Sequence, residues 1–389
     1  MNLDLTAEEL SFREEVRSWL ADNVPSQPRP RDGVAAREHD LAWQARQYQG
    51  GWAGINWPTE YGGRGLSTVE QLLWYEEYAR AGAPDDVNCC FVGNKHGGPT
   101  LILHGTDEQK AIHLPAILRG EVVWCQGFSE PGAGSDLASL RTRGEVDGDH
   151  LVVNGSKIWS SYADVADFQE LLVRSDPDSE RHKGLTWIVC DMDTPGIEVR
   201  PIRNMAGDNE FCEVFYDDVR VPVANVVGAM GDGWTVAMST LSFERGTAFA
   251  ASQVRLARFV DDLVELARRT PRPGGRPAIE DGAIADRLGR AQAEVTALRA
   301  MTWAGVSRTE RTGSPGAEGS MIRVMYAELS QRVHALAMDV LGPAGLDADR
   351  SDGWPRRYLY ELAATIGGGT SQIQREIIAE RVLGLPRSR

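Results

Sequence analysis

The hydrophobic pattern of this 389-residue chain changes twice along its length, and this limits the folds that it can adopt. Residues 1–120 carry apolar side chains at helical spacing. Thr6, Ser67 and Thr106 each have Glu or Gln three positions later, which is the capping-box pattern at the start of a helix. The sequence therefore predicts an all-α N-terminal region.

Short β-prone runs replace the helical pattern in the middle of the chain. The pairs Asp147-Gly148 and Asn154-Gly155 are typical of hairpin turns between such runs. We expect a small antiparallel β domain whose strands include 122–125, 151–153, 171–173, 185–189, 213–216 and 219–222.

Helical periodicity returns after Gly231-Asp232-Gly233. Four segments, 234–269, 282–311, 320–341 and 356–383, are separated by short loops, and Gly367 interrupts the last. Such lengths favour an antiparallel bundle. We therefore expect an α+β multidomain fold: an N-terminal all-α domain (1–120), a middle antiparallel β domain (121–232) and a C-terminal four-helix-bundle-like domain (233–389).

The composition excludes several kinds of partner. A formal net charge of −15 gives no attraction for nucleic acid or anionic membranes. Five cysteines without CxxC spacing argue against disulfides or a zinc site, and His96, His104 and His113 lack metal-ligand spacing. No window approaches about 18 apolar residues, and no export signal is visible. We expect a cytoplasmic protein without a bound metal.

Three segments carry candidate chemistry. The first, 125–136, places Gly132 and Gly134 where a backbone can approach a planar or phosphorylated ligand, with the hydroxyls of Ser129 and Ser135 beside them. Taken alone, this segment also fits an ordinary tight loop. It is not a dinucleotide fingerprint, because GxGxxG in a βαβ unit is absent.

The second segment, 154–161, carries Trp159, which could lie against a flavin, and Ser161, which could reach a ring nitrogen. A tryptophan in a strand also fits a place in the core. In the third, glycines 367–369 lead to Thr370 at a helix N-cap, where free N–H groups favour a pyrophosphate. A capped turn between helices fits it equally.

Together and in this order, the three segments resemble the acyl-CoA dehydrogenase family over nearly the whole chain. SEPGAGSD resembles the family's TEPGAGSD, NGSKIWSS its NGxKxWITN, VFYDDVRVP its domain-closing strand, and GGTSQIQ its EGTSQIQ turn. The resemblance implies bound FAD, a tetramer built through the C-terminal bundle, and electron transfer to an electron-transferring flavoprotein.

The same resemblance implies roles for individual residues. Ser135 would face the acyl-CoA, and Arg245 would line the substrate pocket. The implied FAD-binding residues are Gln126, Phe128, Ser129, Gly134, Trp159, Ser161, Gly369, Thr370 and Gln372.

The catalytic base that the family requires is displaced in this sequence. Most members carry it directly before the GTSQ turn, where this chain has Gly368. A subset similar to the isovaleryl and long-chain enzymes places it on the first long C-terminal helix, immediately before an arginine. Glu244-Arg245 occupies that place, so the resemblance implies that Glu244 is the base.

Two departures from the family pattern concern the FAD site. The stretch 339–343 lacks the family's glutamine and paired glycines, and 281–284 offers no arginine. This is similar to bacterial α2β2 enzymes that act on bulky CoA esters such as steroid side chains, although a homotetramer stays open. An oxygen-using acyl-CoA oxidase and a non-catalytic structural subunit are the alternatives.

Overall fold

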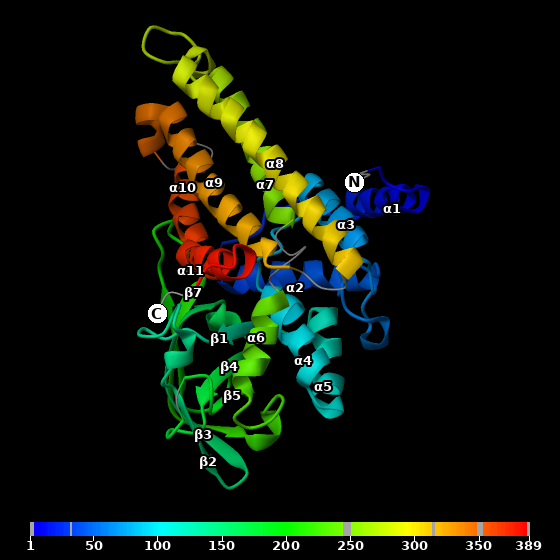
Figure 1. The fold of residues 1–389 in the computed structure, drawn as a ribbon, viewed down its shortest axis with the longest axis vertical. Helices are drawn as coiled ribbons and strands as arrows, with labels where there is room; N and C mark the ends of the chain where they lie inside the picture. The colour runs from blue at the N-terminus through cyan, green and yellow to red at the C-terminus, as the bar shows by residue number, and fades with distance from the viewer. Residues whose placement is uncertain are drawn as a thin grey trace.

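The computed structural model describes residues 4–31, 33–179, 181–243, 250–312, 316–347 and 353–386. Long helices run together at one end of the molecule, the sheet lies at the other end, and the N-terminal helices lie between them (Figure 1). The helix, sheet, helix order confirms the predicted fold class.

The N-terminal region is helical, and its helices begin where the capping pattern predicts. Thr6, Ser67 and Thr106 all close capping boxes. An aromatic core holds the region together, in which Trp52 and Trp74 stack with ring centroids 4.7 Å apart. The helices are α1 (Ala7–Asn23), α2 (Gly33–Gln49), α3 (Thr68–Arg80), α4 (Gly98–His104) and α5 (Asp107–Arg119).

The middle region is one sheet in the order β1-β4-β2-β3-β7-β6, with β5 paired to β4. Four pairings are antiparallel as predicted, whereas β1 and β2 each meet β4 in parallel. The strands are β1 (Trp124–Gly127), β2 (Arg143–Asp147), β3 (His150–Ser161), β4 (Phe168–Arg174), β5 (Leu185–Asp191), β6 (Ile197–Ile202) and β7 (Phe211–Pro222).

The predicted turn at Asn154-Gly155 is wrong, because both residues lie inside β3. β3 pairs with β7 on both sides of Gly155, and a bulge at this point absorbs the irregular backbone. Gly155 has φ +143°, and a Cβ there would lie 2.8 Å from the backbone of Thr142. The glycine serves a close approach within the sheet rather than a chain reversal.

The C-terminal region contains α6 (Gly233–Phe243), α7 (Ala250–Arg269), α8 (Gly282–Thr312), α9 (Glu318–Leu341), α10 (Trp354–Glu361) and α11 (Ser371–Ile377). α6 lies against the sheet and α4: its Val236 shares a core with Trp187, and Thr240 lies 2.8 Å from Thr100, Oγ1 to Oγ1. α7, α8 and α9 form a separate core. None of the described helices combines the length and apolar character needed to cross a bilayer.

Candidate active site

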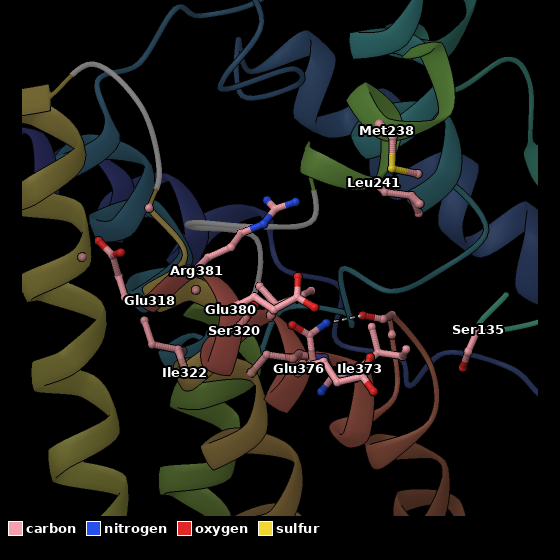
Figure 2. A pocket seen from close by; sticks show the side chains of 18 of the residues that line it. Ser135, Met238, Leu241, Glu318, Ser320, Ile322, Ile373, Glu376, Glu380 and Arg381 are labelled. Atoms are coloured by element: carbon pink, nitrogen blue, oxygen red, sulfur yellow. Dashed lines mark hydrogen bonds between the residues drawn. The ribbon is translucent and has the colours of Figure 1, made fainter. Parts of the chain in front are cut away.

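A cavity of about 830 Å³ opens where the three regions meet. The loop after β1, the end of α6, one face of α8 and α9, and the turn before α11 all contribute to its walls. Figure 2 shows Ser135 across the cavity from Glu318 and Ile322, with Glu376 and Glu380 between them. Cavities of this size accommodate cofactors and drug-sized ligands.

The end of β1 and the loop after it bring five of the predicted residues to this cavity. These are Gln126, Phe128, Ser129, Gly134 and Ser135. A Cβ built at Gly134 would meet nothing within 4 Å, so the loop leaves open space at this point. The first sequence segment is thus assembled into one wall.

A buried lysine holds this loop against β3. Lys157 is fully buried, and its Nζ donates to the carbonyl oxygen of Phe128 at 3.0 Å and to Oε1 of Glu130 at 2.9 Å. Burial lowers the pKa of Lys157 to about 8, although the Glu130 carboxylate opposes the shift. Backbone N–H of Ile158 also donates to the carbonyl oxygen of Ser129 at 2.9 Å. Sequence reasoning missed this clamp, because Glu130 and Phe128 lie 27 and 29 positions before Lys157 in the chain.

Trp159 and Ser161 lie on the strand that this lysine clamps, but they are not part of the cavity wall. β3 has a second bulge between Ile158 and Ser160, where Trp159 adopts the left-handed φ of +64°. Its side chain is 58% exposed and touches Phe211 edge to face. The bulge therefore turns a large aromatic ring outward from the sheet.

The third segment contributes one of its three predicted residues to the cavity. Gly369 lines it, in a turn where Gly368 and Gly369 both have positive φ. A Cβ at Gly369 would lie 2.7 Å from the flexible end of the Gln374 side chain, and the φ of +88° favours glycine at this position. Thr370 caps α11 as predicted by accepting from the backbone N–H of Ile373, whereas Gln372 is exposed and outside the wall.

The predicted base Glu244 and its neighbour Arg245 lie outside the described residues. α6 is described as far as Phe243, and its Met238 and Leu241 line the cavity (Figure 2).

The structure also brings charged side chains to the cavity that sequence reasoning did not assign. Glu376, Glu380 and Arg381 come from α11 and the turn after it, and Glu318 and Arg323 come from α9. The four-residue spacing of Glu376 and Glu380, which places both on one helix face, was the available signal. Glu318 pairs with Arg308 at 3.0 Å.

A buried polar group lies behind the wall of the cavity at Gln126. Nε2 of Gln126 donates to Oε1 of Glu170 at 2.7 Å, and Nδ1 of His96 lies 3.2 Å from the same oxygen. Glu170 is fully buried on β4, and His96 is on the π-helical turn Gly93–Gly97 before α4. We call these three residues the polar triad.

Comparison with known proteins assigns each region of the chain to one family. Residues 6–121, 125–219 and 231–383 match the N-terminal, middle and C-terminal domains of acyl-CoA dehydrogenases. This chain belongs to the acyl-CoA dehydrogenase family of oxidoreductases.

One curated relative and two solved structures are similar to this chain over nearly its whole length. The chain is 45% identical to the acyl-CoA dehydrogenase IpdE1 of Mycobacterium tuberculosis, over 97% of each protein. Among solved structures, a chain of the "Tcur3481-Tcur3483 steroid ACAD" is 34% identical with a TM-score of 0.87 over the full length of both. A chain of the ChsE4-ChsE5 complex from Mycobacterium tuberculosis is 33% identical, with a TM-score of 0.85 and the same coverage.

Proposed function

We propose that this chain is a catalytic subunit that dehydrogenates an acyl-CoA thioester to the trans-2-enoyl-CoA with bound FAD. The observation that supports this most strongly is the cavity at which the SEPGAGSD loop, the end of α6 and the glycine turn before α11 meet. These elements are far apart in sequence, yet they carry the motifs that resemble those of the family.

The described residues fit a flavin. The outward Trp159 ring offers a flat apolar face, and the open space at Gly134 admits a ligand close to the backbone. Bound FAD would supply the acceptor for the β hydride and carry the electrons onward. The residues proposed to hold it are Gln126, Phe128, Ser129, Gly134, Trp159, Ser161, Gly369, Thr370 and Gln372.

Glu244 is the proposed base. Its carboxylate would take the α proton, while hydrogen bonds to the thioester carbonyl stabilise the developing enolate. Two observations support the assignment: Gly368 offers no carboxylate at the more common position, and Leu241, three residues before Glu244, lines the cavity. Ser135 and Arg245 are proposed to contact the acyl-CoA, and Phe128, Leu137 and Leu241 would exclude water.

Anaerobic bleaching of the flavin by a panel of acyl-CoA esters tests this proposal. In measurements on the tetramer with the paired dehydrogenase, we expect Glu244→Gln to keep its bound flavin but to bleach at least about 100-fold more slowly than wild type. Glu265→Gln, at an exposed glutamate of α7, serves as the control. A yellow protein that no ester bleaches, or a Glu244→Gln variant as fast as wild type, would overturn the mechanism.

We also propose the substrate class, assembly and electron acceptor. The structural neighbours described as a steroid enzyme and as a two-protein complex support a bulky acyl-CoA and an α2β2 tetramer with a second acyl-CoA dehydrogenase chain. An electron-transferring flavoprotein is the proposed acceptor. Reduced enzyme that oxygen reoxidises rapidly, but that does not reduce this flavoprotein, would indicate an oxidase instead.

A further inference from the structure

We propose that Lys95 is a modification site, at which the side-chain amine takes a short acyl group from an acyl-CoA thioester. The site is a second, smaller cavity of about 70 Å³ in the N-terminal region, and Trp52, Trp74 and Tyr75 form part of its wall. We call it the lysine pocket. Thioesters of coenzyme A are the substrates of this family, so the acyl donor belongs to a class of compound that the enzyme already meets.

The amine of Lys95 lies at the wall of the lysine pocket, over an aromatic ring. Lys95 is half-buried on the π-helical turn Gly93–Gly97, and its Nζ lies 4.1 Å from the centre of the Tyr75 ring. Among the residues that the structure describes, none accepts a hydrogen bond from this Nζ or forms an ion pair with it. Lys157 differs, because it has two acceptors. The amine of Lys95 is therefore available to a reagent that enters the pocket.

The surroundings favour the free base of Lys95, which is the form of a lysine that attacks a thioester. Burial lowers the pKa of Lys95 to about 7. About half of these side chains are then unprotonated at pH 7, against fewer than about one in a thousand for a lysine with the ordinary pKa of about 10.4. A desolvated lysine of this kind is an activated nucleophile.

The other ionisable groups of the lysine pocket do not compete for this role. Burial raises the pKa of Tyr78 and the pKa of the Cys90 thiol, so both are uncharged near neutral pH. Tyr75 presents the face of its ring to the amine. Asp86 also lines the pocket, and its Oδ1 accepts from Nη1 of Arg255 at 2.8 Å. The carboxylate is thus paired with an arginine rather than with the lysine.

The proposed step is an acyl transfer that needs no oxidant. The lone pair of Nζ attacks the thioester carbonyl carbon, a C–N bond forms, and the C–S bond breaks. Coenzyme A leaves as the thiolate and takes up the proton that the nitrogen releases. Gln47 and Asn56 bring amide N–H donors to the pocket, which suit the oxyanion that forms at the carbonyl.

The product fits the lysine pocket better than the ammonium does. An amide is uncharged, so its burial beside aromatic side chains costs less than the burial of a charge. The volume of about 70 Å³ favours acetyl or propionyl groups over long or ring-containing chains. The pocket therefore selects for small acyl groups.

Acetyl-CoA tests the site independently of the proposed dehydrogenation, because its acyl group has no β carbon and cannot be dehydrogenated. The chain has four lysines, so mass spectrometry can follow each of them: Lys95, Lys110, Lys157 and Lys183. On the folded full-length chain, in the assembly in which it purifies, we expect acetylation of Lys95 at about pH 7.5 to be at least about 10-fold faster than that of Lys110 or Lys183. A rate at Lys95 no higher than at these two lysines overturns the inference.

The pH dependence gives a second measurement on the same protein. Because the free base of Lys95 is nearly complete above its pKa, its acetylation rate should change less than about two-fold between about pH 8 and pH 9. A rate that rises about ten-fold over this interval would show an ordinary lysine and would contradict the inference.

Two controls connect the reactivity to the lysine pocket. Unfolding in guanidinium chloride should bring the rate ratio of Lys95 to Lys183 close to 1, and a ratio that stays as high as in the folded protein would refute a role for the pocket. Benzoyl-CoA, which also cannot undergo α,β-dehydrogenation, carries a ring too large for the pocket. With this ester the ratio in the folded protein should fall several-fold below its value with acetyl-CoA, and an unchanged ratio counts against the proposed site.

Discussion

Two lysines illustrate how local surroundings decide the protonation of a buried base. Lys157 bonds to a carboxylate and a carbonyl, and its pKa is lowered to about 8. Lys95, beside a cavity of about 70 Å³, has its Nζ 4.1 Å from the centre of the Tyr75 ring, and burial lowers its pKa to about 7. The sequence predicted neither environment, because both depend on residues distant along the chain.

Lys95→Met should stabilise the protein most at low pH. An unfolded lysine has a pKa of about 10.4, so between pH 7 and 10.4 the unfolded chain holds a proton that folded Lys95 has released. The contribution of Lys95 to stability therefore rises with pH across this window and is least favourable below it. We expect the gain of the variant in free energy of unfolding to fall by about half between pH 6 and pH 9.

Urea denaturation at both pH values measures this gain. Lys110→Met removes another lysine that stands over a tyrosine ring and controls for the loss of that contact. A gain that is the same at pH 6 and pH 9 would contradict the assignment.

At the scale of elements, β3 marks the limit of prediction from sequence. Helix starts were predictable because a capping box is a local pattern, and Thr6, Ser67 and Thr106 all form one. The bulges of β3 were not, because they arise from its pairing with β7, about 60 positions away. Asn154-Gly155 was accordingly mistaken for a turn, and the outward direction of Trp159 could not be derived.

Substitutions of Trp159 should separate backbone strain from ligand binding. A non-glycine residue in the left-handed region costs about 1 kcal/mol, so Trp159→Gly should be more stable than Trp159→Ala by about that amount. The comparison is informative because the wild-type ring is largely exposed, so its removal leaves little empty core. Both variants should lose flavin affinity to a similar degree, since both lack the ring.

Thermal unfolding of the apoprotein and flavin titration measure the two effects. Wild-type flavin affinity in Trp159→Ala would remove Trp159 from the proposed cofactor site.

At the scale of the whole molecule, the order of the three regions was predictable because the hydrophobic period changes from helical to strand-like and back to helical along the chain. The site was predictable in part. The residues after β1 do line one cavity, but Trp159, Ser161, Thr370 and Gln372 are outside its described wall. The triad was not found, because His96 and Glu170 lie 74 positions apart and meet only through the fold.

The prediction for the whole molecule concerns whether this chain binds FAD alone or only together with a second chain. The departures at 339–343 and 281–284 support an FAD site that a second chain completes. The chain expressed alone should therefore be largely colourless, and co-expression with its paired dehydrogenase should give a yellow α2β2 tetramer. Light scattering after size-exclusion chromatography and flavin absorbance measure both, and a stable yellow homotetramer of this chain alone would contradict the pairing.

The charge pairs of α3 also set an order of events during synthesis. Glu76 is only 2% exposed, and Nε of Arg299 on α8 lies 2.7 Å from its carboxylate, 223 positions later in the chain. A ribosome that adds about 5–20 residues per second needs roughly 10–45 s to supply that arginine. Until then Glu76 has Arg80 of its own helix but not its distant partner. Glu76 of the third helix thus gains this partner only after α8 has been translated.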